Sequence, residues 1–314
     1  MKEYNTASMR ETNPQITGTP DRLRAPIWKR ILRSAVLCYV LLMLILLGFQ
    51  RDLIYHPTRN ESLSTTGAMG VPAAVHHFKF SGNDGVTLRG WHYSRALSES
   101  HPEDLSDAPQ VVIYFPGNAG NRSYRTTPCT MLSDLGCDVL IADYRGYGDN
   151  PGSPSEETLI NDALALWDHV TQEMHVPNDR IVLFGESLGG GIAVQLAAEQ
   201  SRQGTPPGGL IIQSSFSSLA DVAASHYPIV PVRLLLWDQF DSCSQISDIE
   251  CRYLHLHGTA DRVVPFHCGE ALFESAPGDI EKKFVTLEDA GHNDLYSEAR
   301  NFVPFSRALR QWLE

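Results

Sequence analysis

The segment from Arg180 to Gln195 reads "RIVLFGESLGGGIAVQ", and it decides the fold prediction. Its first half has the continuous apolar character of a strand buried on both faces, and its second half is typical of a helix. Ser187 lies where one changes into the other, between Gly185 and Gly189. Small flanking residues let a strand and a helix approach each other around a sharp turn, so the sequence predicts a serine hydroxyl held at the tip of a sheet.

Strand-like and helix-like segments alternate along the rest of the chain. This alternation predicts an α/β fold with a mostly parallel sheet covered by helices on both faces, opened by an antiparallel pair. The segment at about 216–250 breaks the alternation and is predicted to be a short insertion, or lid, lying over the end of the sheet. The predicted strands are 75–80, 87–93, 111–115, 138–144, 180–185, 209–215, 251–258 and 282–288, and the predicted helices are 121–135, 155–172, the segment after Ser187, 266–275 and 299–314.

The N-terminal region differs in character from the remainder. Residues 1–33 contain seven Lys/Arg and three Asp/Glu, whereas the whole chain has a net charge of −12. Residues 31–49 form an apolar run close to the roughly 20 residues that a membrane-spanning helix needs. A cleaved signal peptide is the alternative, but the run ends "LLGFQRD", which is a poor cleavage site. We therefore expect a flexible basic cytoplasmic tail (1–30), a transmembrane signal anchor (31–49) and an extracytoplasmic domain (51–314), oriented by the positive-inside rule.

The amino-acid composition indicates a globular protein and argues against some classes of partner. The chain is 42% hydrophobic and 20% charged, which is typical of a globular protein. Its acidic character argues against binding nucleic acid, whose phosphates would be repelled. The six cysteines show no CxxC or Cys/His spacing, so no zinc site is expected.

Three residues of the types needed for nucleophilic catalysis follow one another along the chain. The segment 185–189 matches G-x-S-x-G, but a serine hydroxyl is a poor nucleophile without a base and an acid that orients that base. Asp261 in "HGTADRVVP" and His292 in "EDAGHNDLY" both follow predicted strands and are the expected acid and base. Taken singly, Asp261 fits a turn or helix-capping residue and His292 a solvated loop residue. Asp289 and Asp294 are the rival acids, but both lie in the same loop as the histidine.

An oxyanion hole needs two backbone N–H groups near the serine. Leu188, directly after the serine, offers the first. Asn118 in the loop "FPGNAGNR" is predicted to offer the second, because Gly117 and Gly120 allow the backbone to approach a reacting carbonyl. The alternative is a plain tight turn.

Several polar residues near these motifs are predicted to serve structure and not chemistry. Glu186 adjoins the serine, but on such a turn we expect its side chain to point into the scaffold. Tyr144 and Arg145 are expected to brace the loop beside the site. His255 and His257 alternate on a strand without a third metal ligand, so they are predicted to be ordinary strand-end histidines.

Together these motifs resemble the α/β-hydrolase superfamily of serine hydrolases. Within it, the chain is similar to a membrane-anchored branch of serine aminopeptidase-like, lysophospholipase and depalmitoylase relatives. Two departures stand out: Pro116 precedes Gly117 where the family usually has His-Gly, and Asn150 stands where a serine is usual. The matching segments are "RDLIYHP", "PGNAGN", "DYRGYGDNPGSPSEE", "FGESLGGG", "SSFSSL", "HGTADRVVP" and "GHNDL".

The resemblance and the residues imply cleavage of esters or thioesters through an acyl-enzyme, with no metal or organic cofactor. The apolar run and the apolar insertion favour the lipid bilayer as a partner and a lipid or acyl-chain substrate. A peptidase or an acyltransferase would use the same machinery. A catalytically silent membrane scaffold that keeps the fold is the alternative from another class.

Overall fold

The computed structural model describes residues 26–64, 75–95, 105 and 110–313, in two units that meet between Leu46 and Leu47. Helix α1 (Ile27–Ile54) begins in the first unit and ends in the second. It is longer than the predicted apolar run of 31–49, because the polar residues at either end of the run include no glycine or proline that would end a helix. Most of the predicted tail, residues 1–25, lies outside the described residues.

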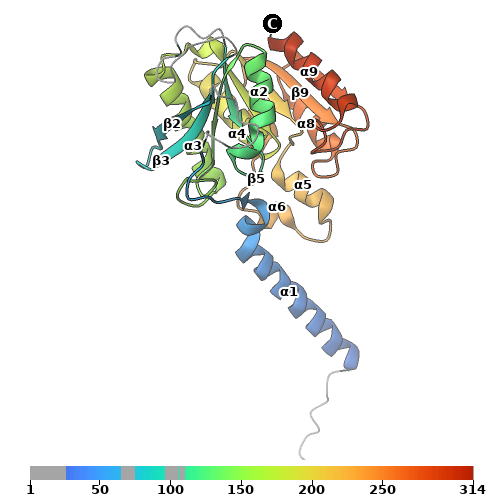
Figure 1. The fold of residues 1–314 in the computed structure, drawn as a ribbon. Coiled ribbons are helices and arrows are strands. Elements are labelled where there is room, and N and C mark those ends of the chain that lie inside the picture. Colours follow the sequence, from blue (N-terminus) through green and yellow to red (C-terminus); the bar gives the residue numbers. More distant parts are fainter. Residues whose placement is uncertain (1–25, 65–74, 96–104, 106–109, 314) are drawn as a thin grey trace, which may run out of the picture. The chain divides into compact units, whose positions relative to one another are not determined.

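The second unit is a sheet flanked by helices (Figure 1). The sheet has eight strands in the order β10-β9-β8-β7-β4-β6-β3-β2. The strands from β10 to β6 are parallel, whereas β3 runs antiparallel to both β6 and β2. This confirms the predicted parallel sheet with an antiparallel opening pair. The strands are β2 (Val75–Ser81), β3 (Thr87–Tyr93), β4 (Val111–Phe115), β6 (Asp138–Ala142), β7 (Ile181–Glu186), β8 (Gly209–Gln213), β9 (Arg252–Gly258) and β10 (Lys282–Leu287).

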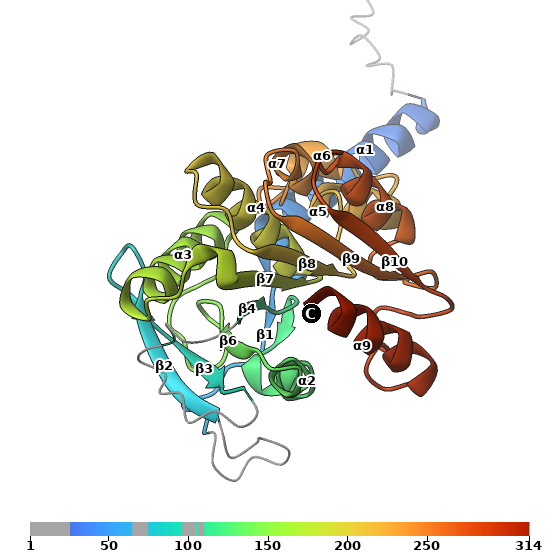
Figure 2. The same cartoon turned by 90° about the horizontal axis from the view of Figure 1, so that it is seen from above.

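Helices cover both faces of this sheet, as Figure 2 shows. In β4, Val111 and Ile113 belong to one buried cluster while Val112 and Tyr114 belong to the other, because successive side chains of a strand point to opposite faces. The first cluster includes residues of α3, α4 and α8, and the second includes residues of α2 and α9. The helices on the sheet are α2 (Thr126–Asp134), α3 (Glu156–Asp168), α4 (Leu188–Arg202), α8 (Phe266–Ser275) and α9 (Ala299–Leu313).

Two helices show how local sequence sets their ends and faces. Helix α3 begins with a capping box between Ser155 and Thr158, and after Asp168 it continues as a π-helical turn, His169–Glu173, so the predicted helix of 155–172 has two parts. Helix α9 buries Phe305, Leu309 and Trp312, which lie on one side of the helix because they are three or four residues apart.

The predicted insertion contains three short helices, α5 (Leu219–His226), α6 (Val232–Leu235) and α7 (Ser242–Ile246). A small parallel sheet of β1 (His56–Pro57) and β5 (Ala119–Gly120) joins the segment after α1 to the loop after β4. The sequence did not predict this pairing, because two-residue strands are too short to show a period of two.

Candidate active site

Ser187 lies on a strained turn between β7 and α4. Its backbone has φ 52° and ψ −116°, a combination that a non-glycine residue rarely adopts and that places the side chain at the tip of the sheet. The turn is fixed by hydrogen bonds from Ser187 N–H to the Gln213 carbonyl (2.9 Å) and from the Ser215 hydroxyl to the Ser187 carbonyl (2.7 Å). A Cβ on Gly189 would lie 2.0 Å from the Phe115 carbonyl oxygen, so a glycine is required there.

The structure brings the three predicted side chains together. His292 Nε2 lies 3.1 Å from Ser187 Oγ, and His292 Nδ1 lies 2.7 Å from Asp261 Oδ2. An ionised carboxylate only accepts hydrogen bonds, so Nδ1 carries the proton and Nε2 presents its lone pair to the serine hydroxyl. This is the tautomer that a general base needs.

Asp261 is held by the loop that follows β9. Its Oδ1 accepts hydrogen bonds from the backbone N–H groups of Val263 and Val264, both at 2.8 Å. The loops carrying the acid and the base meet because Gly258, the last residue of β9, approaches the Ala290 carbonyl so closely that a Cβ there would lie 2.2 Å away. Neighbouring parallel strands, β9 and β10, therefore deliver the acid and the base to the same edge of the sheet.

The two rival acids have other partners. Asp294 accepts hydrogen bonds from the Gly291 N–H and the Asn301 side chain. Asp289 occupies a left-handed conformation with φ 56°, and its N–H donates to the Thr259 hydroxyl. Among the carboxylates that the structure describes, only Asp261 is hydrogen-bonded to His292.

Neither predicted oxyanion donor gives its backbone N–H to a protein group among the described residues. Leu188 is the first residue of α4, and first-turn N–H groups have no acceptor within their helix. Within the described part of the chain, the backbone N–H of Asn118 also donates to no protein group. The loop of Asn118 is braced by two hydroxyls: Tyr147 donates to the Asn118 carbonyl (2.8 Å) and Tyr144 to the Pro116 carbonyl (2.6 Å). Pro116, which replaces the family's usual histidine, is thus anchored through its carbonyl.

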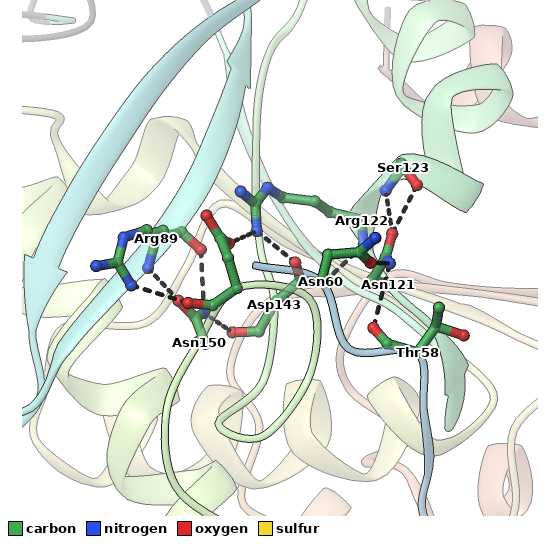
Figure 3. A network of polar contacts seen from close by, with 9 residues as sticks. Thr58, Asn60, Arg89, Asn121, Arg122, Ser123, Asp143 and Asn150 are labelled. Atoms are coloured by element: carbon green, nitrogen blue, oxygen red, sulfur yellow. Dashed lines mark hydrogen bonds and ion pairs between the residues drawn. The ribbon is translucent and has the colours of Figure 1, made fainter. Parts of the chain in front are cut away.

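A polar network lies behind this loop (Figure 3). The buried Arg122 donates to Asp143 through both its backbone N–H (2.6 Å) and its guanidinium. The Asn121 amide donates to the Thr58 carbonyl at 3.2 Å. Asn150 accepts from Arg89 N–H (2.9 Å) and donates to the Asp143 carbonyl (2.6 Å), so its role is to join strands and not to react. Burial raises the pKa of Asp143 to about 6, while Arg122 acts in the opposite direction.

Glu186 points into the scaffold, as expected, and accepts from Tyr114 Oη and Arg125 Nε, both at 2.7 Å. Sequence reasoning missed Arg125, whose Nη2 also donates to the Ala119 carbonyl in the oxyanion loop at 3.4 Å. It also missed Tyr147, although the "YRGYG" repeat of tyrosines was a usable signal.

Arg145 does not brace the loop beside the site, which corrects the prediction. Its guanidinium pairs instead with Asp162 and Asp84. Among the residues given structural detail, no group of three or more His, Cys, Asp or Glu side chains is placed to hold a metal ion.

Comparison with known proteins identifies the family of this chain. A family model described as "Serine aminopeptidase, S33" matches residues 106–237, which include the strand–serine–helix turn. An uncharacterized protein of Mycobacterium tuberculosis (strain H37Rv) is 38% identical over 245 residues, covering 78% of this chain and 81% of that protein. The chain belongs to the α/β-hydrolase superfamily.

Other relatives place this α/β hydrolase among esterase- and lipase-like enzymes. The lysophosphatidylserine lipase ABHD12 of Danio rerio is 30% identical over 75% of this chain, which spans 64% of that relative's length. A solved structure, an α/β hydrolase from Vibrio vulnificus, superposes with a TM-score of 0.62 at 19% identity and covers 76% of this chain and 81% of that one. The superposition shows the shared fold.

Proposed function

We propose that this protein is a membrane-anchored serine hydrolase that cleaves carboxylic ester or thioester bonds through an acyl-enzyme. The observation that carries the proposal is the line of hydrogen bonds from Asp261 through His292 to Ser187 on a strained turn. Such a line converts an otherwise inert hydroxyl into a nucleophile.

The steps of the reaction follow from the tautomer of His292, whose Nε2 can accept a proton. Ser187 Oγ forms a bond to the acyl carbon while its proton passes to His292 Nε2, and the imidazolium is stabilised by Asp261. The carbonyl oxygen becomes an oxyanion, to which the N–H groups of Leu188 and Asn118 donate. Collapse breaks the bond to the leaving alcohol or thiol, which takes the proton from Nε2. A water molecule then repeats the sequence, its proton going to Nε2 and its oxygen to the released acid, and Ser187 is regenerated.

A lipid or acyl-chain substrate is favoured by exposed apolar side chains on the insertion. Tyr227, Leu234 and Trp237 of the insertion are 61%, 86% and 59% exposed, which is unusual for large apolar side chains unless they meet a ligand or a surface. The name of the ABHD12 relatives, lysophosphatidylserine lipase, points to the same class of substrate.

Membrane anchoring is supported by helix α1. Among the described residues it is long and apolar enough to cross a membrane, with a mean hydropathy of 2.4 over its most apolar stretch. The basic residues before it favour an N-terminus that stays in the cytoplasm and a catalytic domain on the other side. Protection of an N-terminal epitope from protease in sealed cells, with cleavage only after permeabilisation, tests this orientation.

The test of the chemistry is fluorophosphonate labelling of the full chain together with turnover of p-nitrophenyl butyrate. Ser187→Ala is expected to abolish labelling and to lower kcat by a factor on the order of 10⁶. Ser306→Ala is the matched control, because that hydroxyl lies on α9 and, among the described residues, bonds only the Val303 carbonyl. Normal labelling of Ser187→Ala would reject this serine as the nucleophile, and absence of labelling in the wild type would favour a silent scaffold.

A peptidase is the second candidate, because the matching family model carries the description "Serine aminopeptidase". An aminopeptidase needs an acidic group for the substrate's amino terminus. The carboxylate nearest in sequence to the serine, Glu186, is already engaged by Arg125 and Tyr114. Faster cleavage of aminoacyl amides than of matched esters would favour the peptidase, and transfer of the acyl group to an added alcohol in preference to water would favour an acyltransferase.

A further inference from the structure

The end of helix α1 is bonded to the insertion at several points. Asp238, which is 3% exposed, accepts from Arg51 through Nε (3.0 Å) and Nη2 (3.1 Å) and from Tyr55 Oη (3.0 Å). The Gln50 side chain accepts from the Trp237 N–H at 2.7 Å. Bidentate arginine–carboxylate pairs are among the most geometrically specific polar contacts, so this group of bonds fixes the insertion to residues 50–55.

Four large apolar side chains project from the same insertion. We call Tyr227, Ile229, Leu234 and Trp237 the apolar surface; all four are at least 59% exposed. Single exposed apolar residues are normal, but four within eleven consecutive residues are unusual. On α1, Phe49 and Leu53 are also exposed and lie one turn apart.

We propose that the apolar surface contacts the bilayer into which residues 31–49 insert. Chain continuity carries the argument: the apolar run ends at Phe49, so Gln50 and Arg51 lie at the membrane boundary, and these same residues bond positions 237 and 238. The insertion is thereby held at the level of the lipid headgroups, where tryptophan and tyrosine are enriched.

This contact would place the reacting residues beside their substrate. His226 at the end of α5 bonds the Val263 carbonyl at 2.9 Å, and the Val263 N–H in turn donates to Asp261. A lipid leaving the bilayer would therefore meet the insertion first and the catalytic loop next. The proposal rests on the membrane anchoring proposed above.

Photocrosslinking of the full chain in phosphatidylcholine vesicles tests the contact. p-Benzoylphenylalanine is placed at Leu234, at Leu41 within the apolar run, and at the exposed Asp179, which precedes β7 at the opposite edge of the sheet. We expect lipid adducts at positions 234 and 41 and none at 179. Asp238→Asn is expected to reduce the adduct at 234 severalfold while leaving that at 41 unchanged.

The possible outcomes distinguish the proposed bilayer contact from the proposed membrane anchor, and none of them depends on hydrolytic activity. Adducts at 41 without adducts at 234, or protein–protein adducts at 234, would overturn the bilayer contact and leave the anchor intact. Absence of adducts at 41 would overturn the anchor and the contact together. Equal adducts at 234 and 179 would show that the contact is not specific.

A second, independent inference comes from a chain of buried side chains behind the triad. Tyr253, His255 and His257 lie on the same face of β9, at every second position, and all three are fully buried. Tyr253 Oη lies 2.6 Å from His255 Nδ1, and His255 Nε2 lies 3.3 Å from His257 Nδ1. His257 Nε2 reaches the Val264 carbonyl at 3.0 Å and lies 3.5 Å from Asp261 Oδ2.

The direction of the hydrogen bonds among these three side chains follows from the last acceptor, the Val264 carbonyl. A carbonyl oxygen can only accept, so His257 Nε2 carries a proton and its Nδ1 is an acceptor. His255 must then donate from Nε2 and accept at Nδ1, where the Tyr253 hydroxyl donates. Burial lowers the pKa of His255 well below its ordinary value and also lowers that of His257, so both rings stay neutral as this pattern requires. The hydrogen bonds therefore all run in one direction, from Tyr253 through His255 and His257 to the loop that carries Asp261.

The absence of a side chain at Gly269 leaves space for the two histidine rings. A Cβ on Gly269 of α8 would lie 2.2 Å from His257 Nδ1 and 3.0 Å from His255 Nε2. A glycine inside a helix is about 1 kcal/mol less favourable than alanine. Gly269 therefore makes α8 less stable at the point where the two histidine rings pack against it.

We infer that His257 is a positioning residue for Asp261. Val264 links them, because its carbonyl accepts from His257 while its N–H donates to Asp261 Oδ1. The charged or titratable groups facing His257 are His255 on its own strand, Asp261, and His292 in the loop after β10, whereas α8 presents Gly269 and the Phe266 ring. His257 thus fixes the loop and directs a polar N–H at the oxygen that bonds His292.

Variants of His257 test this role in the hydrolase proposed above. His257→Leu removes the donor at similar volume, and we expect kcat for p-nitrophenyl butyrate to fall at least about tenfold, since small displacements of catalytic groups are costly. The acid limb of the pH profile should move upward, because Asp261 would then direct more of its charge at His292. His257→Gln keeps an N–H donor and should restore most of kcat and the wild-type profile.

A His257→Leu protein that is less stable but keeps the wild-type kcat and pH profile would overturn the inference. If that variant does not fold, Tyr253→Phe, which removes one hydroxyl at the far end of the chain, decides: a lower kcat with the same upward shift supports the inference, and an unchanged profile rejects it. Loss of fluorophosphonate labelling in the wild type would instead reject the proposed hydrolase itself.

Discussion

Replacing Gly189 by alanine tests how closely the serine turn and the oxyanion loop must approach each other. The new Cβ would lie 2.0 Å from the Phe115 carbonyl oxygen and 2.7 Å from that of Pro116, which are backbone atoms that cannot rotate away. A non-bonded contact of about 3 Å is the least that such atoms tolerate, so α4 and the loop after β4 must separate by roughly 1 Å. Asn118 lies in this loop and would move with it.

The expected loss of kcat can be estimated in two ways. A misplacement of about 1 Å in a catalytic constellation lowers the rate on the order of 10²-fold. Loss of one oxyanion donor lowers kcat about 10²- to 10³-fold, equivalent to about 3–4 kcal/mol of transition-state stabilisation. Overpacking is also expected to lower the free energy of unfolding by about 1–3 kcal/mol. The protein should therefore stay folded while kcat falls at least about a hundredfold.

The assay compares kcat for p-nitrophenyl butyrate with the free energy of unfolding in denaturant. Gly278→Ala is the matched control, because no atom lies within 4 Å of the position a Cβ would take there and its backbone φ is not in the left-handed range. We expect the control to change stability by no more than about 0.5 kcal/mol and to leave kcat unchanged. Equal kcat values for the two alanine variants would refute the reasoning that this close approach forms the oxyanion hole.

Three further predictions follow from other parts of the site. Tyr147→Phe removes one neutral hydrogen bond to the oxyanion loop, so kcat should fall about two- to tenfold at unchanged Tm, and an unchanged kcat would show that the brace is dispensable. Asp143→Asn leaves the fully buried guanidinium of Arg122 with Asp149 as its remaining ion-pair partner, so chemical denaturation should show a loss of about 1.5–3 kcal/mol; a loss below about 1 kcal/mol would contradict this. Burial lowers the pKa of His255 and His257 below the ordinary 6.5, so the unfolded chain takes up protons first and the free energy of unfolding should fall as the pH drops below about 6.5, by up to roughly 1.4 kcal/mol per pH unit for each histidine. His255→Gln should flatten this slope, and an equal slope would exclude His255 as a cause.

Local sequence patterns predicted the parts of this protein that depend on neighbouring residues. The continuous apolar run before Ser187 and the glycines around it indicated a strand, a sharp turn and a helix. Alternating segments indicated the parallel sheet. Since parallel strands deliver their carboxyl ends to one edge, the order of Ser187, Asp261 and His292 was enough to predict that they meet.

Only the tertiary structure decided which distant groups hold these residues in place. Arg125 and Arg145 look alike in sequence, yet the first supports the oxyanion loop and the second binds two carboxylates elsewhere. The pairing of Asp238 with Arg51, and the chain from Tyr253 to Asp261, likewise join groups whose distance no local period encodes. A sequence determines periodicity and turn chemistry residue by residue, whereas the partner of a buried charge or N–H depends on which surfaces the completed fold presses together.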